Sequence, residues 1–157
     1  MDLAITTTET IDSETYGAIL NLRKEVFVVE QQVPLSIEVD EFESTSIHFL
    51  ARADGVPVAT GRIRSKGPRV TFERIATAAA CRGRGYGRRL MAAMEAAAAE
   101  RFPRHLPFMH SQESAVAFYE RLRWVTIGER FEEADIPHFA MVKWPKSLGQ
   151  RGSSDQL

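Results

Sequence analysis

The sequence CRGRGYGRR occupies residues 81–89, between a predicted strand and the clearest predicted helix of the chain. Glycines without side chains let main-chain N–H groups converge on an oxygen-rich ligand, and the positive end of the following helix adds to the attraction for phosphate. The side chains of Arg82, Arg84, Arg88 and Arg89 would reinforce that attraction. The spacing is not G-x-G-x-x-G and no G-K-[ST] follows, which excludes a dinucleotide fingerprint and a P-loop. A tight strand-to-helix connection with a solvated basic face is the alternative interpretation.

Downstream of this turn, the pattern of apolar residues predicts two helices and three strands. Residues 86–101 are rich in alanine and place Leu90, Met94 and Ala97 on one stripe, which predicts a helix that ends before Pro103. After that helix we expect a strand over 106–112, a short helix over 114–123, and strands over 125–132 and 138–144.

Upstream of the turn, the sequence predicts a hairpin. Residues 47–53 and 56–65 flank Asp54-Gly55, a dipeptide that tolerates the positive backbone dihedrals of a tight turn. Nearer the N-terminus we expect an edge strand over 1–7, a helix that begins near Ser13, and a loop over 31–46.

A further strand, over 69–77, leads into the glycine-rich turn. Its alternation of apolar residues slips between Phe72 and Ile75, which predicts a β-bulge. A strand that splays from its neighbour leaves unpaired backbone donors and acceptors for a ligand. The order of strands and helices contains no repeat and predicts a mixed α/β fold with a central sheet.

The composition limits the class of protein. The chain has 157 residues, of which 44% are hydrophobic and 26% charged, and its net charge is -1. These values predict one globular domain over residues 1–145, with a flexible C-terminal tail over 146–157, and no nucleic-acid partner. Without a membrane-length apolar run or a secretory signal, we expect a cytoplasmic protein with no membrane partner. The four histidines lack paired metal-ligand spacing, so we expect no metal.

Several separated segments resemble the GNAT superfamily of acetyl-CoA-dependent N-acetyltransferases. They are FERIAT at 72–77, RGRGYG at 82–87, which meets the R/Q-x-x-G-x-G/A signature in full, and AVAFY at 115–119. The segment LRKEVFVVEQQVP at 22–34, with Asp40 and the IPH segment at 136–138, resembles the ElaA-like branch of that superfamily. The resemblance implies an α/β fold in which helices flank a mixed central sheet with splayed strands, and it implies acetyl-CoA as the acyl donor.

The resemblance also implies which residues bind the two substrates. The main chain around Ile75 to Thr77 would pair with the pantetheine arm, and N–H groups of the glycine-rich turn would hold the pyrophosphate. The residues expected in the cofactor site are Ile75, Ala76, Thr77, Arg82, Gly83, Arg84, Gly85, Tyr86, Gly87, Arg88, Gln112 and Phe118. Those expected to contact the acceptor are Arg23, Phe27, Glu30, Asp40 and His138.

Acetyl transfer to an amine requires a proton for the departing thiolate. A phenol can donate that proton, so Tyr119 is the predicted general acid, and the resemblance implies the same residue. The alternative is a tyrosine that only packs against Phe118.

The general base has two candidates. Glu73 on the central strand is the first, and its alternative role is an ion pair with an arginine such as Arg74 or Arg62. His110, on the strand before the tyrosine helix, is the second, and its alternative role is that of a hydrogen-bonded structural histidine.

Acidic residues gather at 38–43 and 132–135, in segments that border the acceptor site in the resembling family. They would attract a cationic amine, and solvated loop charges are the alternative. We therefore expect an N-acetyltransferase that moves the acetyl group of acetyl-CoA to a primary amine of a small molecule or peptide by direct attack. The identity of the acceptor and the oligomeric state stay open, although the resemblance implies a homodimer.

Two rival functions are compatible with the sequence. The pattern of Arg23, Phe27, Asp40 and Phe42 is also similar to that of acyl-homoserine lactone synthases, which share the fold and use S-adenosylmethionine. The other rival is a CoA-binding sensor without turnover, which Arg123 suggests because a small residue is usual there in the resembling family.

Overall fold

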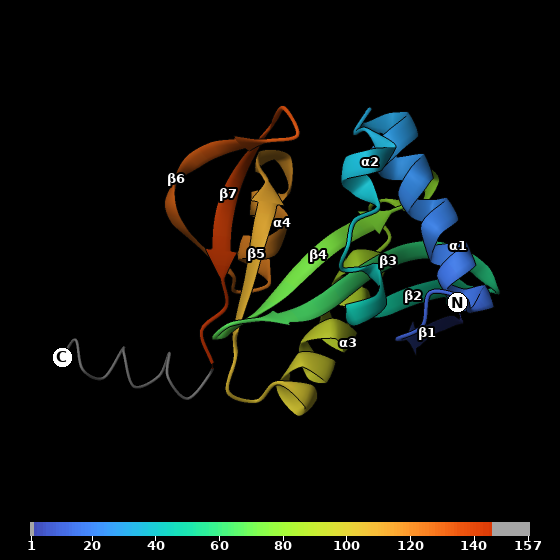
Figure 1. Ribbon diagram of the computed structural model, residues 1–157, viewed down its shortest axis with the longest axis horizontal. Coiled ribbons are helices and arrows are strands. Elements are labelled where there is room, and N and C mark those ends of the chain that lie inside the picture. The colour runs from blue at the N-terminus through green and yellow to red at the C-terminus, as the bar shows by residue number, and fades with distance from the viewer. Residues whose placement is uncertain (1, 146–157) are drawn as a thin grey trace.

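A computed structural model describes residues 2–145, which form a seven-stranded sheet with helices on both faces (Figure 1). The strands are β1 (Leu3–Thr8), β2 (Ile47–Ala53), β3 (Val56–Lys66), β4 (Arg69–Thr77), β5 (Leu106–Gln112), β6 (Val125–Glu133) and β7 (Ile136–Val142). The helices are α1 (Glu14–Arg23), the π-helix η1 (Lys24–Glu30), α2 (Leu35–Glu38), α3 (Tyr86–Arg101) and α4 (Val116–Arg121), with short 3₁₀ turns η2 (Glu43–Thr45), η3 (Ala79–Cys81) and η4 (Glu113–Ala115). The strand order β1-β2-β3-β4-β5-β7-β6, with β4 and β5 parallel, confirms the mixed α/β fold.

Local signals in the sequence explain the predicted turns and helix starts. The Oγ atom of Ser13 accepts a hydrogen bond from the Tyr16 N–H at 3.0 Å and caps the start of α1. Asp54 and Gly55 adopt φ angles of +50° and +82°, the left-handed backbone of a tight hairpin turn between β2 and β3. Gly85, with φ of +82°, turns the chain into α3. The predicted hairpin and long helix are therefore confirmed.

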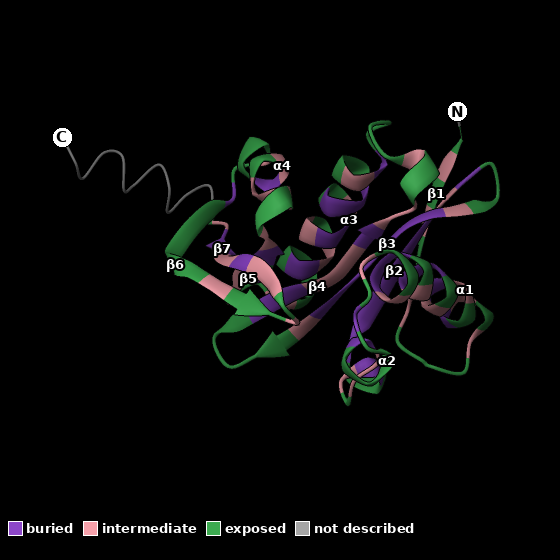
Figure 2. Ribbon diagram, turned by 90° about the horizontal axis from the view of Figure 1, so that it is seen from above, coloured by how far each residue is buried: buried purple, intermediate pink, exposed green. Residues whose placement is uncertain are grey.

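The helices cover opposite faces of the sheet (Figure 2). Helix α3 packs on β2, β3 and β4 from one side, and α1 packs on β2 and β3 from the other. The main core lies under α3, where Leu90, Met91 and Met94 are buried in one cluster with Phe49 and Ile63. Strand β6, at the edge of the sheet, is largely exposed. The two long helices thus stabilise the half of the sheet that contains β2, β3 and β4.

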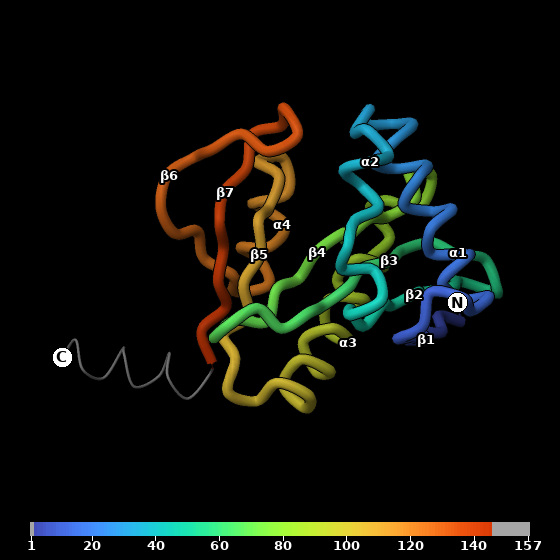
Figure 3. Tube along the Cα trace, viewed as in Figure 1, coloured from blue at the N-terminus to red at the C-terminus, as the bar shows by residue number. Residues whose placement is uncertain are grey.

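Strands β4 and β5 diverge along their length. They are parallel partners only over 69–71 and 106–108, and beyond these residues β4 pairs with β3 while β5 pairs with β7. The two parts of the sheet separate like the arms of a V, which is visible in the ribbon and in the chain trace (Figure 1, Figure 3). The splay is therefore confirmed, and the backbone of β4 beyond Thr71 has no paired strand on its β5 side.

A bulge interrupts β4 at its centre. The β3–β4 register shifts after Thr60, so that Arg74 and Ile75 together lie opposite Gly61. Arg74 adopts the left-handed backbone, with φ of +54°. A Cβ atom on Gly61 would lie 2.7 Å from Met94 Sδ, so glycine lets α3 pack directly over the bulged pair of strands. The bulge predicted within 69–77 is confirmed.

Some predicted elements differ from the structure. The segment 31–46, predicted as a loop, contains α2 and η2, because contacts from distant strands fix its side chains. Helix α1 continues into the π-helix η1, a change of hydrogen-bonding pattern that apolar periodicity does not reveal. The first and last strands are slightly displaced, to 3–8 and 136–142. The predicted tail, 146–157, lies outside the described residues, and within 2–145 no helix is long and apolar enough to cross a bilayer.

Candidate active site

A cavity of about 620 Å³ lies between the diverging strands β4 and β5. Its lining also includes side chains from β3, η1, α2 and the turn between β6 and β7. The volume falls in the range of small-molecule sites. Of the residues expected in the site, the cavity brings together Phe27, Glu73, Ile75, His110, Gln112, Tyr119 and His138.

Tyr119 reaches the cavity from helix α4. Its side chain is buried, with edge contacts to the rings of Phe118 and Trp124 at centroid distances of 5.0 Å and 6.4 Å. Within residues 2–145, its hydroxyl has no hydrogen-bond partner. Burial raises the pKa of Tyr119 above the ordinary value for a phenol. The side chain therefore carries its proton across the neutral pH range.

The glycine-rich turn lies outside the cavity, between η3 and α3. Gly83 and Gly85 have φ angles of +80° and +82°, and a Cβ atom would find nothing within 4 Å at Gly83 and only the end of Arg88 at 4.0 Å from Gly85. A Cβ atom on Gly87 would lie 3.3 Å from Phe118 Cζ, so the small residue lets α3 approach α4. The turn is exposed, as are Arg84 and Arg88, whereas Tyr86 and Ala76 are buried.

Arg82 joins the glycine-rich turn to two other elements. Its Nε donates to the Thr77 carbonyl at 3.1 Å, and its two Nη atoms each lie 2.7 Å from a carboxylate oxygen of Glu30. Hydrogen bonds from Arg82 hold the pKa of Glu30 below its ordinary value. The structure thus places Glu30, an expected acceptor contact, beside the expected phosphate turn and outside the large cavity.

Glu73 lines the cavity but is already paired. One carboxylate oxygen accepts from Arg62 Nε at 3.1 Å and from Arg64 Nε at 2.8 Å, and the other accepts from Arg64 Nη2 at 3.1 Å. This corresponds to the alternative role considered for Glu73, with Arg64 as an additional partner. Arg74 instead points to α2, where its Nε donates to the Glu38 carbonyl at 3.0 Å.

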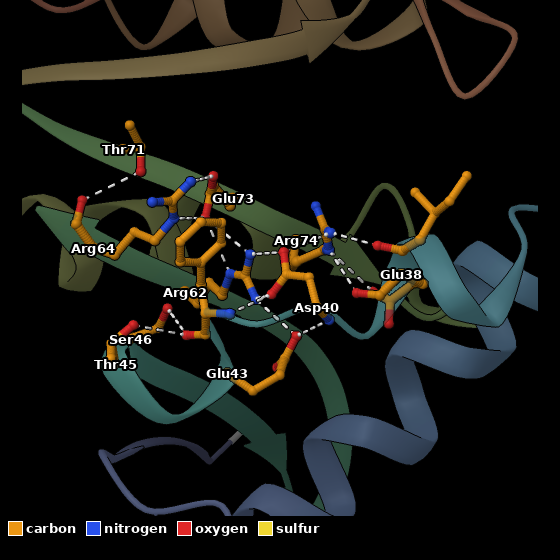
Figure 4. A network of polar contacts seen from close by, with 12 residues as sticks. Glu38, Asp40, Glu43, Thr45, Ser46, Arg62, Arg64, Thr71, Glu73 and Arg74 are labelled. Carbon is orange, nitrogen blue, oxygen red and sulfur yellow. Dashed lines mark hydrogen bonds and ion pairs between the residues drawn. The ribbon is translucent and has the colours of Figure 1, made fainter. Parts of the chain in front are cut away.

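The network behind Glu73 fixes the segment 35–46 on the sheet (Figure 4). Arg23 contacts two glutamates, with Nε 2.8 Å from Glu38 Oε1 and Nη1 2.7 Å from Glu43 Oε1. Arg62 contacts Glu43 and Asp40, with Nη1 2.8 Å from Glu43 Oε2 and Nη2 2.6 Å from Asp40 Oδ2. Burial by itself would raise the pKa of Glu43, but hydrogen bonds from Arg23 outweigh it and hold that pKa well below its ordinary value. Arg23 and Asp40 lie outside the cavity lining, so their described contacts are internal to the fold.

The acidic stretches differ in what their carboxylates contact. Glu38, Asp40 and Glu43 are paired with arginines and offer no open cation site. Glu133, in contrast, lines the cavity next to His110 and His138. Nothing in the sequence distinguishes Glu133 from its acidic neighbours, because only the pairing of β6 with β7 places it there.

Comparisons with known proteins agree with this geometry. The family model for the acetyltransferase (GNAT) domain matches residues 8–144. The uncharacterized N-acetyltransferase YjcF of Bacillus subtilis is 37% identical over 123 residues, which cover 78% of this chain and 87% of that protein. ElaA of Escherichia coli is 29% identical over 130 residues, 80% of this chain and 85% of ElaA.

Solved structures give the same assignment. An acyl-CoA N-acyltransferase from Pseudomonas aeruginosa superposes with a TM-score of 0.81 and 31% identity, covering 91% of this chain and 100% of the other. The structure of Escherichia coli ElaA also has a TM-score of 0.81, with 27% identity and coverage of 92% and 100%. With its splayed sheet, bulged central strand and glycine-rich turn, the chain belongs to the GNAT family of acetyltransferases, in the ElaA-like branch.

Proposed function

We propose that residues 1–145 form an N-acetyltransferase domain that transfers the acetyl group of acetyl-CoA to a primary amine of a small molecule or peptide. The observation that carries this proposal is the cavity between β4 and β5. Tyr119 lines this cavity together with the part of β4 that does not pair with β5. An extended amide-containing arm can pair with such a strand as a missing neighbour would.

The described residues fit acetyl-CoA in two separate respects. The backbone at Ile75 to Thr77 lies on the part of β4 that β5 does not pair with, so those of its polar groups that β3 and Arg82 do not occupy are available to pantetheine amides. The turn over 83–88 presents main-chain N–H groups at the start of α3, a 16-residue helix whose positive end favours a pyrophosphate. Arg84 would add positive charge near that group, whereas the charge of Arg82 is offset by Glu30.

Tyr119 supplies the proton for the leaving group in this mechanism. As the neutral amine nitrogen forms its bond to the thioester carbonyl carbon, the carbon–sulfur bond breaks and the sulfur takes the phenolic proton. The tyrosinate then recovers a proton from the nitrogen of the new amide. This role requires a protonated phenol in the resting site, and burial, which raises the pKa of Tyr119, is compatible with that requirement.

Thiol release from acetyl-CoA, measured against pools of polyamines, amino acids, aminoglycosides, arylamines and short peptides, tests the proposal. We expect one pool to give turnover together with an acetylated amine. A rise in Tm with acetyl-CoA but no thiol release from any pool would instead favour a CoA-binding sensor. A lactone product from an acyl carrier and S-adenosylmethionine would favour the synthase-like alternative.

The glycine-rich turn gives a sharper test of the donor site. Gly85→Ala is expected to raise the KM for acetyl-CoA about tenfold or more with little change in kcat, because a Cβ atom at φ of +82° distorts N–H groups that hold phosphate. Gly55→Ala is the matched control, since Gly55 has the same φ and open surroundings in the β2–β3 hairpin. An equal effect of both substitutions on the KM would contradict the assignment of the turn.

A further inference from the structure

We propose that His138, Glu133 and His110 form a proton relay, in which His138 accepts the proton of the incoming ammonium group and Glu133 and His110 conduct it to solvent. This inference rests on the proposed amine acetylation and assigns its general base. The three residues come from β7, the end of β6 and β5, and all three line the cavity that contains Tyr119.

The hydrogen bonding of His138 leaves one ring nitrogen for the cavity side. Its Nδ1 lies 2.7 Å from the Ile136 carbonyl oxygen, which can only accept, so Nδ1 carries the proton of the neutral ring. The lone pair is then on Nε2, which lies 3.7 Å from Glu133 Oε2. The imidazole is buried, with 7% of its side chain exposed, and stacks on Phe131 at a centroid distance of 5.8 Å. The ring is therefore held in a tautomer and an orientation suited to accepting a proton.

Glu133 connects this buried ring to the surface. Its other oxygen, Oε1, lies 2.9 Å from His110 Nδ1, and the His110 side chain is 44% exposed. The hydrogen bond from His110 holds the pKa of Glu133 below its ordinary value, with further contributions from His138 and Arg74. The Glu133 carboxylate thus lies between two imidazoles, with one oxygen toward each. The cluster thus links a base in the cavity to an imidazole in contact with water.

The other carboxylates of the cavity lining are already paired with arginines. Glu73, the other expected base, is shared between two arginines, and Glu38 lies at 1% exposure beneath Arg74 and Arg23. Within residues 2–145, Glu133 is the carboxylate of the cavity lining that has no arginine partner. An ammonium group entering the cavity would therefore be drawn toward Glu133 and lie next to His138 Nε2.

The protons balance across the reaction. One N–H bond of the ammonium group breaks as His138 Nε2 gains the proton, and the freed lone pair attacks the carbonyl carbon. A second nitrogen-bound proton goes to Tyr119, which replaces the one given to sulfur. The proton on His138 leaves through Glu133 and His110, so each turnover releases one proton to solvent and restores the three side chains.

The test is the pH dependence of kcat/KM for the best amine found by the thiol-release assay. In the unmodified protein we expect kcat/KM to rise with pH across the range in which imidazoles ordinarily titrate, about pH 6–7. His138→Gln should lower kcat/KM about 100-fold at neutral pH and extend the rise well above pH 7, toward the pKa of the amine, because only amine that is already neutral can then react. With an amine that is uncharged at pH 7, such as an arylamine, the same substitution should cost much less.

Glu133 and His110 act through His138 and are positioning residues. Glu133→Gln should lower kcat/KM about tenfold and alter its pH dependence, since a neutral amide cannot take the proton from His138 and pass it to His110. Glu129→Gln is the matched control, because it removes a carboxylate from the same strand at an exposed position without a contact to either histidine. It should leave the pH profile unchanged.

A measurement without turnover separates the relay from the proposed function. Nitrogen NMR of the imidazoles should show the neutral His138 ring protonated at Nδ1, and a ring protonated at Nε2 would overturn the relay. Amine acetylation that persists in a folded His138→Gln protein with an unchanged pH profile would overturn the relay alone. Failure of the unmodified protein to acetylate any amine, with the Nδ1 tautomer intact, would overturn the proposed function and the relay with it.

Discussion

Replacement of Tyr119 by phenylalanine is expected to lower kcat about 100-fold while the KM for acetyl-CoA stays within about threefold. The physical reason is the missing proton donor, because the thiolate must then leave as an anion in the cavity that the buried Tyr119 lines. The ring itself keeps its contacts with Phe118 and Trp124, so the packing of α4 is preserved. Steady-state kinetics by thiol release measure both constants.

The matched control for that substitution is Tyr16→Phe. Tyr16 is also buried, but it lies on α1, where its hydroxyl donates to Glu43 Oε1 at 3.0 Å and burial raises its pKa to about 12. Its loss should lower Tm and leave kcat unchanged. A Tyr119→Phe protein that keeps kcat within about threefold would assign Tyr119 to packing alone. A fall in Tm equal to that of Tyr16→Phe, together with a raised KM, would indicate a distorted site instead.

The parts of the fold that the sequence predicts correctly have local causes. Asp54 and Gly55 make a hairpin because they adopt positive φ at low cost, and the neighbouring strands follow from alternation. The bulge was visible as a slip in that alternation at 72–75, where the structure places Arg74 at φ of +54°. In these segments the backbone preference and the burial pattern agree, and no distant contact is needed to decide between alternatives.

Segments fixed by distant charges could not be predicted in this way. Helix α2 and the turn η2 bury no apolar side chain, and both are held by Arg23, Arg62 and Arg74. These arginines come from α1, β3 and β4, far from residues 35–46 in the sequence. A run of acidic residues gives the same pattern whether its carboxylates face solvent or buried guanidinium groups. The sequence therefore predicts an open loop over 31–46, and the structure pairs Asp40, which the resemblance implies as an acceptor contact, with Arg62 instead.

In the candidate site, too, residues with a local sequence signal were predictable and residues placed by distant contacts were not. Motif residues such as Tyr119 and the glycine-rich turn could be located in the sequence because each has a defined local spacing. The neighbourhood of His138 depends instead on the β5–β7–β6 order, which brings Gln112 and Phe131 opposite His138. That order places β7 between two strands that precede it in the chain. No local sequence pattern indicates this strand order, so the sequence does not distinguish Glu133 from its acidic neighbours.

Arg23→Met is expected to lower the free energy of unfolding by about 3–5 kcal/mol at neutral pH. The arginine side chain is 1% exposed and pairs with Glu38 and Glu43, whose side chains are 1% and 6% exposed. Its removal leaves two buried carboxylates without their main cation, although Arg62 and Arg74 remain nearby. Denaturant unfolding measures the change. Arg101→Gln is the control, because Arg101 pairs with Glu9 on the surface and its loss should leave the midpoint unchanged.

The pH dependence of the stability lost in the Arg23→Met protein identifies the cause of that loss. The pKa of Glu43 is lower in the folded protein than its ordinary value of 4.5, so its stabilising contribution is complete above about pH 4.5 and is lost as the pH falls below it. In the Arg23→Met protein that contribution is largely absent, and protonation of the carboxylates relieves the uncompensated charge. The two stability curves should therefore converge as the pH falls from 5 toward 3, by about 1 kcal/mol or more. A difference that stays constant over this range would mean that Arg23 stabilises the fold by packing, and that the network positions the 35–46 segment without depending on its charges.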